Sequence, residues 1–151
     1  MRFVGREKEL QSLEGLNQKD NAIAVIYELA RQGLENVCRQ HAVKLADLLG
    51  FSAVNYRVGP YFRAARGQAP GVQVDLIFDR DDHVLTLCEM KSSRAPIAMS
   101  VLAEIERKRE ILQAQYPRHT IQSVLIYDGL LNAELQKSPY LFKTINAQEL
   151  I

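Results

Sequence analysis

Two strand-like segments around a short polar turn constrain the fold of this chain more than any other feature. Residues 72–78 and 84–90 are mostly apolar, and the turn at 79–83 reads Asp-Arg-Asp-Asp-His. Apolar runs of this length on both sides of a polar turn are typical of a β-hairpin. Successive side chains of a strand point to opposite faces. The alternation predicts one face with Asp75 and Ile77, and the opposite face with Val74, Leu76 and Phe78.

The position of the turn determines which residues of the hairpin lie opposite each other. If the three residues after Arg80 form the loop, Asp75 lies opposite Glu89. Directly opposed Cβ atoms lie roughly 4.5–5.5 Å apart. Lys91 follows on the same face as Glu89. Two carboxylates at this distance repel by about 3–4 kcal/mol at an effective dielectric of about 20. A shared proton, a cationic side chain or a divalent metal relieves this repulsion.

Two interpretations of this face are open from the residues alone. Mg²⁺ prefers oxygen ligands such as paired carboxylates and water. It lowers the pKa of a bound water and stabilises charge on a phosphate. With Lys91 holding the attacking water or a phosphate oxygen, Asp75, Glu89 and Lys91 would form a site for phosphodiester hydrolysis. The alternative is a solvated face on which Lys91 forms a cross-strand ion pair with the two carboxylates.

The rest of the chain alternates between helical and strand-like patterns, which predicts an α/β fold. Apolar residues recur every three or four positions over 22–49 and 98–116, which indicates amphipathic helices. We expect the first of these to bend or break near Gly33 and to end at Gly50. The remaining predictions are a helix at 3–16, strands at 52–58, 121–127 and 140–145, a loop at 59–71 and a frayed end at 148–151.

The composition favours one cytoplasmic domain, and it implies that any binding of nucleic acid depends on a local site. A length of 151 residues suits a single domain, and a formal net charge of +1 exerts no overall attraction on nucleic acid. Cys38 and Cys88 lie among apolar residues, so we expect buried free thiols in a reducing compartment. The chain has no signal-peptide pattern and no apolar run of about 18 residues, so we expect no membrane association.

The string Asp75 … Glu89-Met90-Lys91 resembles the Asp … Glu-X-Lys core of the PD-(D/E)XK nuclease superfamily. The predicted element order also resembles its αβββαβ core, which implies a restriction-endonuclease-like fold with a mixed central sheet flanked by helices. Val74 stands where the superfamily usually has proline. The resemblance implies that Asp75, Glu89 and the main-chain carbonyl of Met90 hold Mg²⁺ or Mn²⁺, with Lys91 as the catalytic cation. It also implies an acidic metal ligand on the first core helix, for which Glu35 is the candidate.

More narrowly, the chain resembles a family of prokaryotic AAA-type ATPases that carry a nuclease-like domain at the C-terminus. Residues 34–41, 74–77 and 87–92 are similar to that domain, and residues 3–10 are similar to the opening of the ATPase half. We therefore divide the chain into an N-terminal helical segment at 1–20 and a nuclease-like domain at 21–151. The chain contains no Gly-x-x-x-x-Gly-Lys-Ser/Thr loop, so we expect no bound nucleotide.

Nucleic acid, with DNA favoured, is the expected partner. Lys108 and Arg107 lie on the helix that often flanks the active cleft in this fold, and Lys108, on the side of Ile105 and Leu112, is the candidate for a phosphate contact. The alternative for Lys108 is i,i+4 pairing with Glu104. Arg63, the third candidate, lies in a segment rich in basic and aromatic residues. Such a combination can bind single strands. Domains of this type are frequently homodimers, and we expect one here. The alternative function is a non-catalytic interaction or regulatory module derived from the C-terminal domain of an ATPase.

Overall fold

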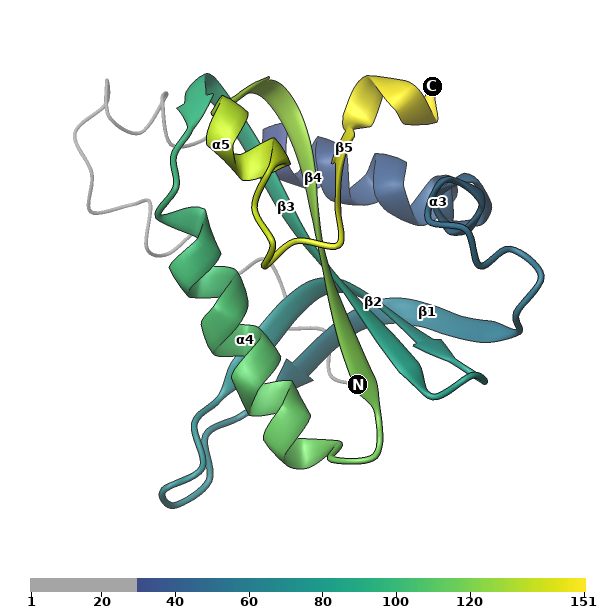
Figure 1. Cartoon of the computed structure of the whole chain (residues 1–151), viewed down its shortest axis with the longest axis vertical. Helices are drawn as coiled ribbons and strands as arrows, with labels where there is room; N and C mark the ends of the chain where they lie inside the picture. Colours follow the sequence, from purple (N-terminus) through teal and green to yellow (C-terminus); the bar gives the residue numbers. More distant parts are fainter. Residues whose placement is uncertain (1–29) are drawn as a thin grey trace.

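The computed structural model describes residues 30–151, which form one β-sheet between two layers of helix (Figure 1). The sheet has the strand order β1-β2-β3-β4-β5. β1, β2 and β3 are antiparallel neighbours, whereas β3, β4 and β5 run parallel. This is the mixed α/β sheet that the sequence predicts. The strands are β1 Tyr56–Arg63, β2 Val72–Arg80, β3 Val84–Ile97, β4 Thr120–Leu131 and β5 Lys143–Asn146.

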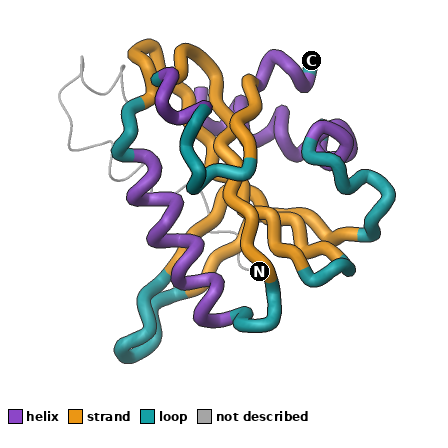
Figure 2. The backbone as a smooth tube through the Cα atoms, viewed as in Figure 1, coloured by secondary structure: helices purple, strands orange, loops and turns teal. Residues whose placement is uncertain are grey.

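Helices cover both faces of the sheet and bury two hydrophobic cores (Figure 1, Figure 2). Residues 30–48 and the C-terminal turn pack on one face, and α4 packs on the other. Cys38 and Cys88 are buried free thiols in the first of these cores, as expected. The order of one helical region, three strands, a helix and a strand confirms the predicted core. The helices are residues 30–40, α3 Ala42–Leu48, α4 Val101–Gln115, α5 Ala133–Gln136 and the 3₁₀ helix η1 Ala147–Leu150.

The first strand begins later and continues further than the sequence predicts. A strand was expected at 52–58 and a loop at 59–71, but β1 starts after a turn in which Val54 N–H donates to the Phe51 carbonyl at 2.9 Å. β1 then passes through Pro60 without ending. Proline lacks the N–H that a central strand needs, yet an edge strand tolerates it, and β1 is an edge of this sheet.

The first helical region is interrupted at His41 and not at Gly33, so the predicted position of the break is wrong. Residues 30–40 are helical, so the helix runs through Gly33 without a break. At the interruption, His41 N–H still bonds to the Val37 carbonyl at 3.0 Å, and Leu45 N–H bonds to the His41 carbonyl at 2.9 Å. Helical hydrogen bonds therefore continue across the turn.

The end of this helix agrees with the prediction, but the end of the chain does not. Gly50 adopts φ 82°, the left-handed conformation that favours glycine after a helix. Residues 148–151 were expected to fray, but η1 begins in a capping box between Asn146 and Glu149. The Glu149 carboxylate accepts from Asn146 N–H at 2.8 Å. The other predicted elements are present as α4, β4 and β5 with shifted ends, and α5 was not predicted.

The predicted register of the β2–β3 hairpin is confirmed. Leu76 pairs with Cys88 and Asp79 pairs with Leu85, as a loop of three residues after Arg80 requires. The paired residues end at Leu76 and Cys88, and Asp75 and Glu89 are the next residues of β2 and β3 beyond this last pair. The hairpin therefore brings the two carboxylates of the proposed site to the same end of the two strands.

A β-bulge in β2 changes which way the neighbouring side chains point. Asp75 and Leu76 of β2 together lie opposite the single residue Pro60 of β1. The extra residue shifts the alternation of faces, so Val74 packs on the α4 side with Ile77, while Leu76 packs on the opposite side. The prediction that Val74 shares a face with Leu76 is therefore wrong. Bulges of this kind are frequent next to active sites, because they redirect a side chain.

The predicted helix at 3–16 and the proposed segment boundary at residue 20 lie outside the described residues. Within 30–151, no helix is long and apolar enough to cross a membrane.

Candidate active site

A pocket of about 600 Å³ lies at the end of β2 and β3 where the bulge occurs. Several elements contribute to its wall, including the helix at 30–40, the β1–β2 connection and α4. Asp75, Glu89, Met90 and Lys91, which the sequence predicts as one site, all line this pocket. The other charged residues that line it are Arg31, Arg63, Glu104, Arg107 and Lys108.

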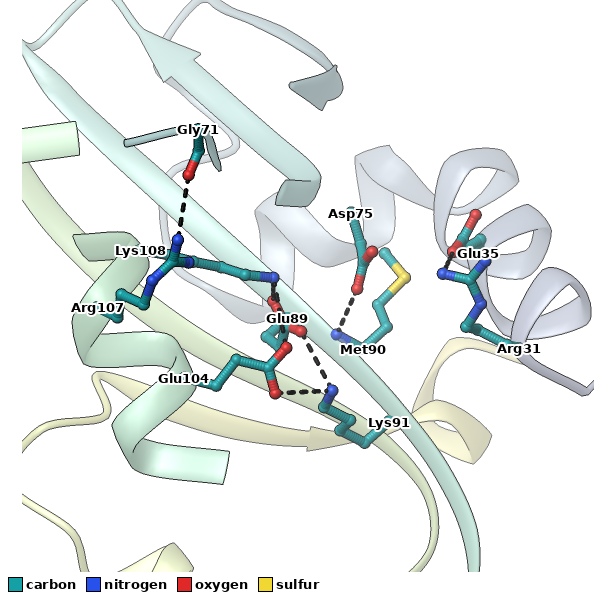
Figure 3. Close-up of polar contacts among 10 residues, drawn as sticks. All are labelled: Arg31, Glu35, Gly71, Asp75, Glu89, Met90, Lys91, Glu104, Arg107 and Lys108. Carbon is teal, nitrogen blue, oxygen red and sulfur yellow. Dashed lines mark hydrogen bonds and ion pairs between the residues drawn. The ribbon is translucent and has the colours of Figure 1, made fainter. Parts of the chain in front are cut away.

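Asp75 holds the main chain of β3 beside the pocket (Figure 3). Its Oδ2 accepts a hydrogen bond from Met90 N–H at 3.1 Å. The N–H and C=O groups of one strand residue point to the same side of the strand, as in a hydrogen-bonded pair that exchanges both bonds. The Met90 carbonyl therefore points from β3 towards the side on which Asp75 lies. This orientation suits the predicted use of that carbonyl as an oxygen donor.

Glu89 is buried and contacts two lysines from different elements (Figure 3). Its Oε2 lies 2.7 Å from Lys108 Nζ, and its Oε1 lies 3.4 Å from Lys91 Nζ. Glu104 of α4 contacts the same two cations, at 3.0 Å from Lys91 and 3.7 Å from Lys108. Two carboxylates and two ammonium groups thus alternate in one cluster, in which each lysine contacts both glutamates.

Lys108 does not have the position expected of a phosphate ligand. The sequence places it correctly on the apolar side of α4, where Ile105 and Leu112 are buried. Its side chain is only 11% exposed, and its ammonium is committed to Glu89. Glu104 is a member of the cluster that the sequence interpretation did not propose as a site residue. Its contact with Lys108 is the i,i+4 pairing that the sequence offers as the alternative role of Lys108.

Glu35, the proposed acidic ligand from the first helix, is held by two arginines of its own helix. Its carboxylate lies 3.4 Å from Arg31 and 3.6 Å from Arg39. Figure 3 shows Glu35 and Arg31 on the far side of Asp75 and Met90 from Glu89. Arg31 lines the pocket, so the helix contributes a cation to the wall.

Arg63 and Arg107 face the pocket while bound to neutral acceptors. Arg63 Nη1 donates to Gln115 Oε1 at 2.7 Å, and Arg107 Nη2 donates to the Gly71 carbonyl at 3.3 Å. A Cβ at Gly71 would lie 3.0 Å from the Ala65 nitrogen, so glycine permits the close approach of the two chain segments. Among residues 30–151 neither guanidinium forms an ion pair with a carboxylate, so these contacts orient both groups without neutralising their charge.

Comparison with known proteins finds distant likeness in structure. No family model matches the chain, and no curated protein matches its sequence. The chain is similar to a repair endonuclease from Pyrococcus abyssi, with a TM-score of 0.44, 14% identity and coverage of 72% of this chain and 46% of that chain. It is similar to EndoMS in its complex with double-stranded DNA, with a TM-score of 0.41, 16% identity and coverage of 70% and 43%. A third similar structure is a protein of unknown function, with a TM-score of 0.47, 12% identity and coverage of 73% and 56%.

The chain spans about half the length of these solved structures. Because such a likeness concerns fold, the function of this chain has to be argued from its own site.

The donors in the pocket suit a hard divalent cation, but lysines compete for one of them. Carboxylate and carbonyl oxygens of Asp75, Glu89 and Met90 are the ligand type that Mg²⁺ and Mn²⁺ prefer. Within residues 30–151, no group of three or more acidic, histidine or cysteine side chains gathers closely enough to hold a metal. A metal at Glu89 would have to replace Lys91 or Lys108 as the partner of at least one carboxylate oxygen.

Burial, and then the negative charge of Asp75, raises the pKa of Glu89 to about 6, although Lys108 and Lys91 lower it. The ion pairs therefore offset only part of the cost of removing the carboxylate from water. The folded state holds the Glu89 proton more tightly than the unfolded state does, so protonation of Glu89 stabilises the fold. This stabilisation is complete below the ordinary glutamate pKa of 4.5, and it is lost as the pH rises through about 6.

We therefore expect a pH-dependent difference in stability between the wild type and Glu89→Gln. The free energy of unfolding of the wild type, relative to the variant, should fall by on the order of 2 kcal/mol between pH 4 and pH 7. Urea unfolding at both pH values measures it, and Glu134→Gln, on the exposed side of α5, controls for the loss of one carboxylate. A difference that does not change with pH would contradict the raised pKa.

Proposed function

We propose that this pocket is a metal-dependent phosphodiester hydrolysis site that acts on nucleic acid, with DNA favoured. The observation that carries the proposal is the convergence, in one pocket, of Asp75, Glu89 and Lys91 with two arginines held by neutral acceptors. The resemblance of Asp75 … Glu89-Met90-Lys91 to the nuclease core supports it independently.

Each residue of the pocket has a distinct task in this proposal. Asp75, Glu89 and the Met90 carbonyl would hold Mg²⁺ or Mn²⁺, which supplies a water of lowered pKa and stabilises charge on the scissile phosphate. Lys91, whose ammonium Glu104 holds at 3.0 Å, places positive charge beside that phosphate. Partial burial lowers the pKa of Lys91, but hydrogen bonds and charges from Glu104 and Glu89 raise it above its usual range, so Lys91 keeps its charge.

The arginines would bind the phosphates that flank the scissile one. A guanidinium offers a planar set of donors that matches phosphate oxygens, and its charge does not titrate near neutral pH. Because Arg63 and Arg107 reach the pocket from β1 and α4, they would contact the nucleic-acid backbone from two directions. Glu35, on the first helix, would act at most through a water in this arrangement.

A cleavage assay tests the proposed function. Wild type should cut labelled single-stranded or double-stranded DNA or RNA in Mg²⁺ or Mn²⁺, and EDTA should stop the reaction. Asp75→Asn should abolish cleavage while retaining the fold, because asparagine can still accept from Met90 N–H but lacks the charge that binds metal. Asp81→Asn in the exposed hairpin turn is the matched control and should cut normally. The proposal is contradicted if wild type cuts none of these substrates.

The second candidate is a non-catalytic interaction module, and the engagement of both Glu89 oxygens by lysines favours it. In that case Lys91 and Lys108 neutralise the carboxylate permanently, and the domain serves assembly or regulation, as the resemblance to ATPase C-terminal domains implies. Thermal melts with Mg²⁺, Mn²⁺ and ATP distinguish the two candidates. The nuclease proposal requires stabilisation by a divalent metal and none by ATP, whereas the module requires no effect of metal. Light scattering would test the proposed homodimer.

A further inference from the structure

β1 carries three aromatic residues, and the structure gives them different roles. Tyr56 packs edge-on against Phe78 in the core, with ring centroids 5.2 Å apart. The Tyr61 hydroxyl donates to Gln115 Oε1 at 3.0 Å. Phe62 is 48% exposed and lines the pocket that contains Asp75. Tyr56 and Tyr61 are thus explained by packing and hydrogen bonding, whereas the ring of Phe62 is available to a ligand.

The surroundings of Phe62 indicate what kind of ligand fits. Phe62 and Arg63 are consecutive in β1, so their side chains leave the edge strand towards opposite faces, yet both line the same pocket. Residues on both faces of the sheet therefore line this pocket, with the apolar ring of Phe62 on one face and two arginines, Arg63 and Arg107, on the α4 face. A ligand that fills it needs a flat apolar group and a phosphate within one repeating unit. A nucleotide of a nucleic-acid strand has both.

We propose that Phe62 is a stacking platform for one unpaired base, so that the pocket takes single-stranded nucleic acid or an unpaired end in preference to a continuous duplex. In a duplex, neighbouring base pairs cover the faces of each base, and extruding a base requires unstacking and unpairing. An unpaired base presents its face without that cost, and stacking on an aromatic ring does not depend on base identity. The assignment rests on the proposed function, because it assumes that Arg63 and Arg107 bind the adjacent phosphates.

A binding experiment on the full chain, in EDTA so that no cleavage occurs, tests this assignment. The probes are a fluorescent single strand of about 15 nucleotides and the same strand in a blunt duplex, and anisotropy reports the Kd. Phe62→Ala should weaken single-strand binding by about 5- to 100-fold and leave duplex binding unchanged. Phe62→Tyr should restore single-strand binding, because tyrosine retains the aromatic face. Phe142→Ala is the matched control, since Phe142 is 52% exposed and precedes β5 at the opposite edge of the sheet.

The outcomes separate this inference from the proposed function. If wild type binds the single strand and Phe62→Ala binds it as tightly as Phe142→Ala does, the role of Phe62 is overturned while the nuclease proposal stands. If wild type binds the single strand and the duplex with equal affinity, the proposed preference for single-stranded nucleic acid is overturned. If wild type binds neither probe, the inference is overturned, and the cleavage assay in Mg²⁺ or Mn²⁺ decides the proposed function separately. Loss of single-strand binding in Phe62→Ala, with rescue by tyrosine, supports the inference whether or not the wild type cleaves.

Discussion

Lys91→Ala is expected to reduce strand cleavage by about 100- to 1000-fold, the effect typical of removing one preorganised group that stabilises transition-state charge. Lys91 is 34% exposed, and it contacts Glu89 and Glu104 at the pocket. In the proposed mechanism it supplies positive charge to the phosphate and does not ligate the metal. Metal binding should therefore survive its removal, and it should become tighter if Lys91 no longer competes for Glu89.

Two measurements on Lys91→Ala distinguish this role from a structural one. Single-turnover cleavage gives the chemical rate, and thermal melts give metal binding independently of activity. Metal at about 100 times its Kd should stabilise both wild type and variant by about 2.7 kcal/mol. Lys44→Ala on the exposed side of α3 is the control for removing one lysine. Cleavage at the wild-type rate would remove Lys91 from the mechanism, and loss of the metal-induced shift would make it part of the metal site.

Lys108→Met is expected to destabilise the fold by about 3 kcal/mol, because it leaves a buried carboxylate without its closest cation. Lys108 Nζ is 2.7 Å from Glu89 Oε2, and the two side chains are 11% and 3% exposed. The same substitution should be nearly neutral in the background of Glu89→Gln, which has no buried negative charge to compensate. A double-mutant cycle should therefore give a coupling energy of about 3 kcal/mol.

An exposed ion pair of similar length provides the control for this cycle. Arg57 Nη2 lies 2.6 Å from Asp79 Oδ2, but the Arg57 side chain is 88% exposed. The corresponding cycle on Arg57 and Asp79 should give a coupling of about 1 kcal/mol or less, because water screens the pair. Urea unfolding at pH 7 of the single and double variants measures both cycles. Equal coupling in the two pairs would show that burial does not strengthen the contact between Lys108 and Glu89.

The sequence by itself determines the hairpin and the placement of Asp75 and Glu89 near each other on its two strands. These follow from short-range rules, since a loop of three residues after Arg80 sets the register and the strands follow from local apolar runs. The pairing of Leu76 with Cys88 confirms that register. The cap at Gly50 was also predictable, because a positive φ after a helix favours glycine on local steric grounds.

Only the tertiary structure decides the details on which the chemistry depends, because each of them involves residues far apart in the chain. The bulge at Asp75 requires β1 as an edge partner, and Pro60 is compatible with a strand only at an edge. Lys108 was predicted to face phosphate, but packing of α4 against β3 brings it to Glu89. Tyr61 and Phe62 are adjacent aromatic residues, and the sequence does not show which of them faces the pocket. In the fold, Tyr61 bonds to Gln115 and Phe62 lines the pocket.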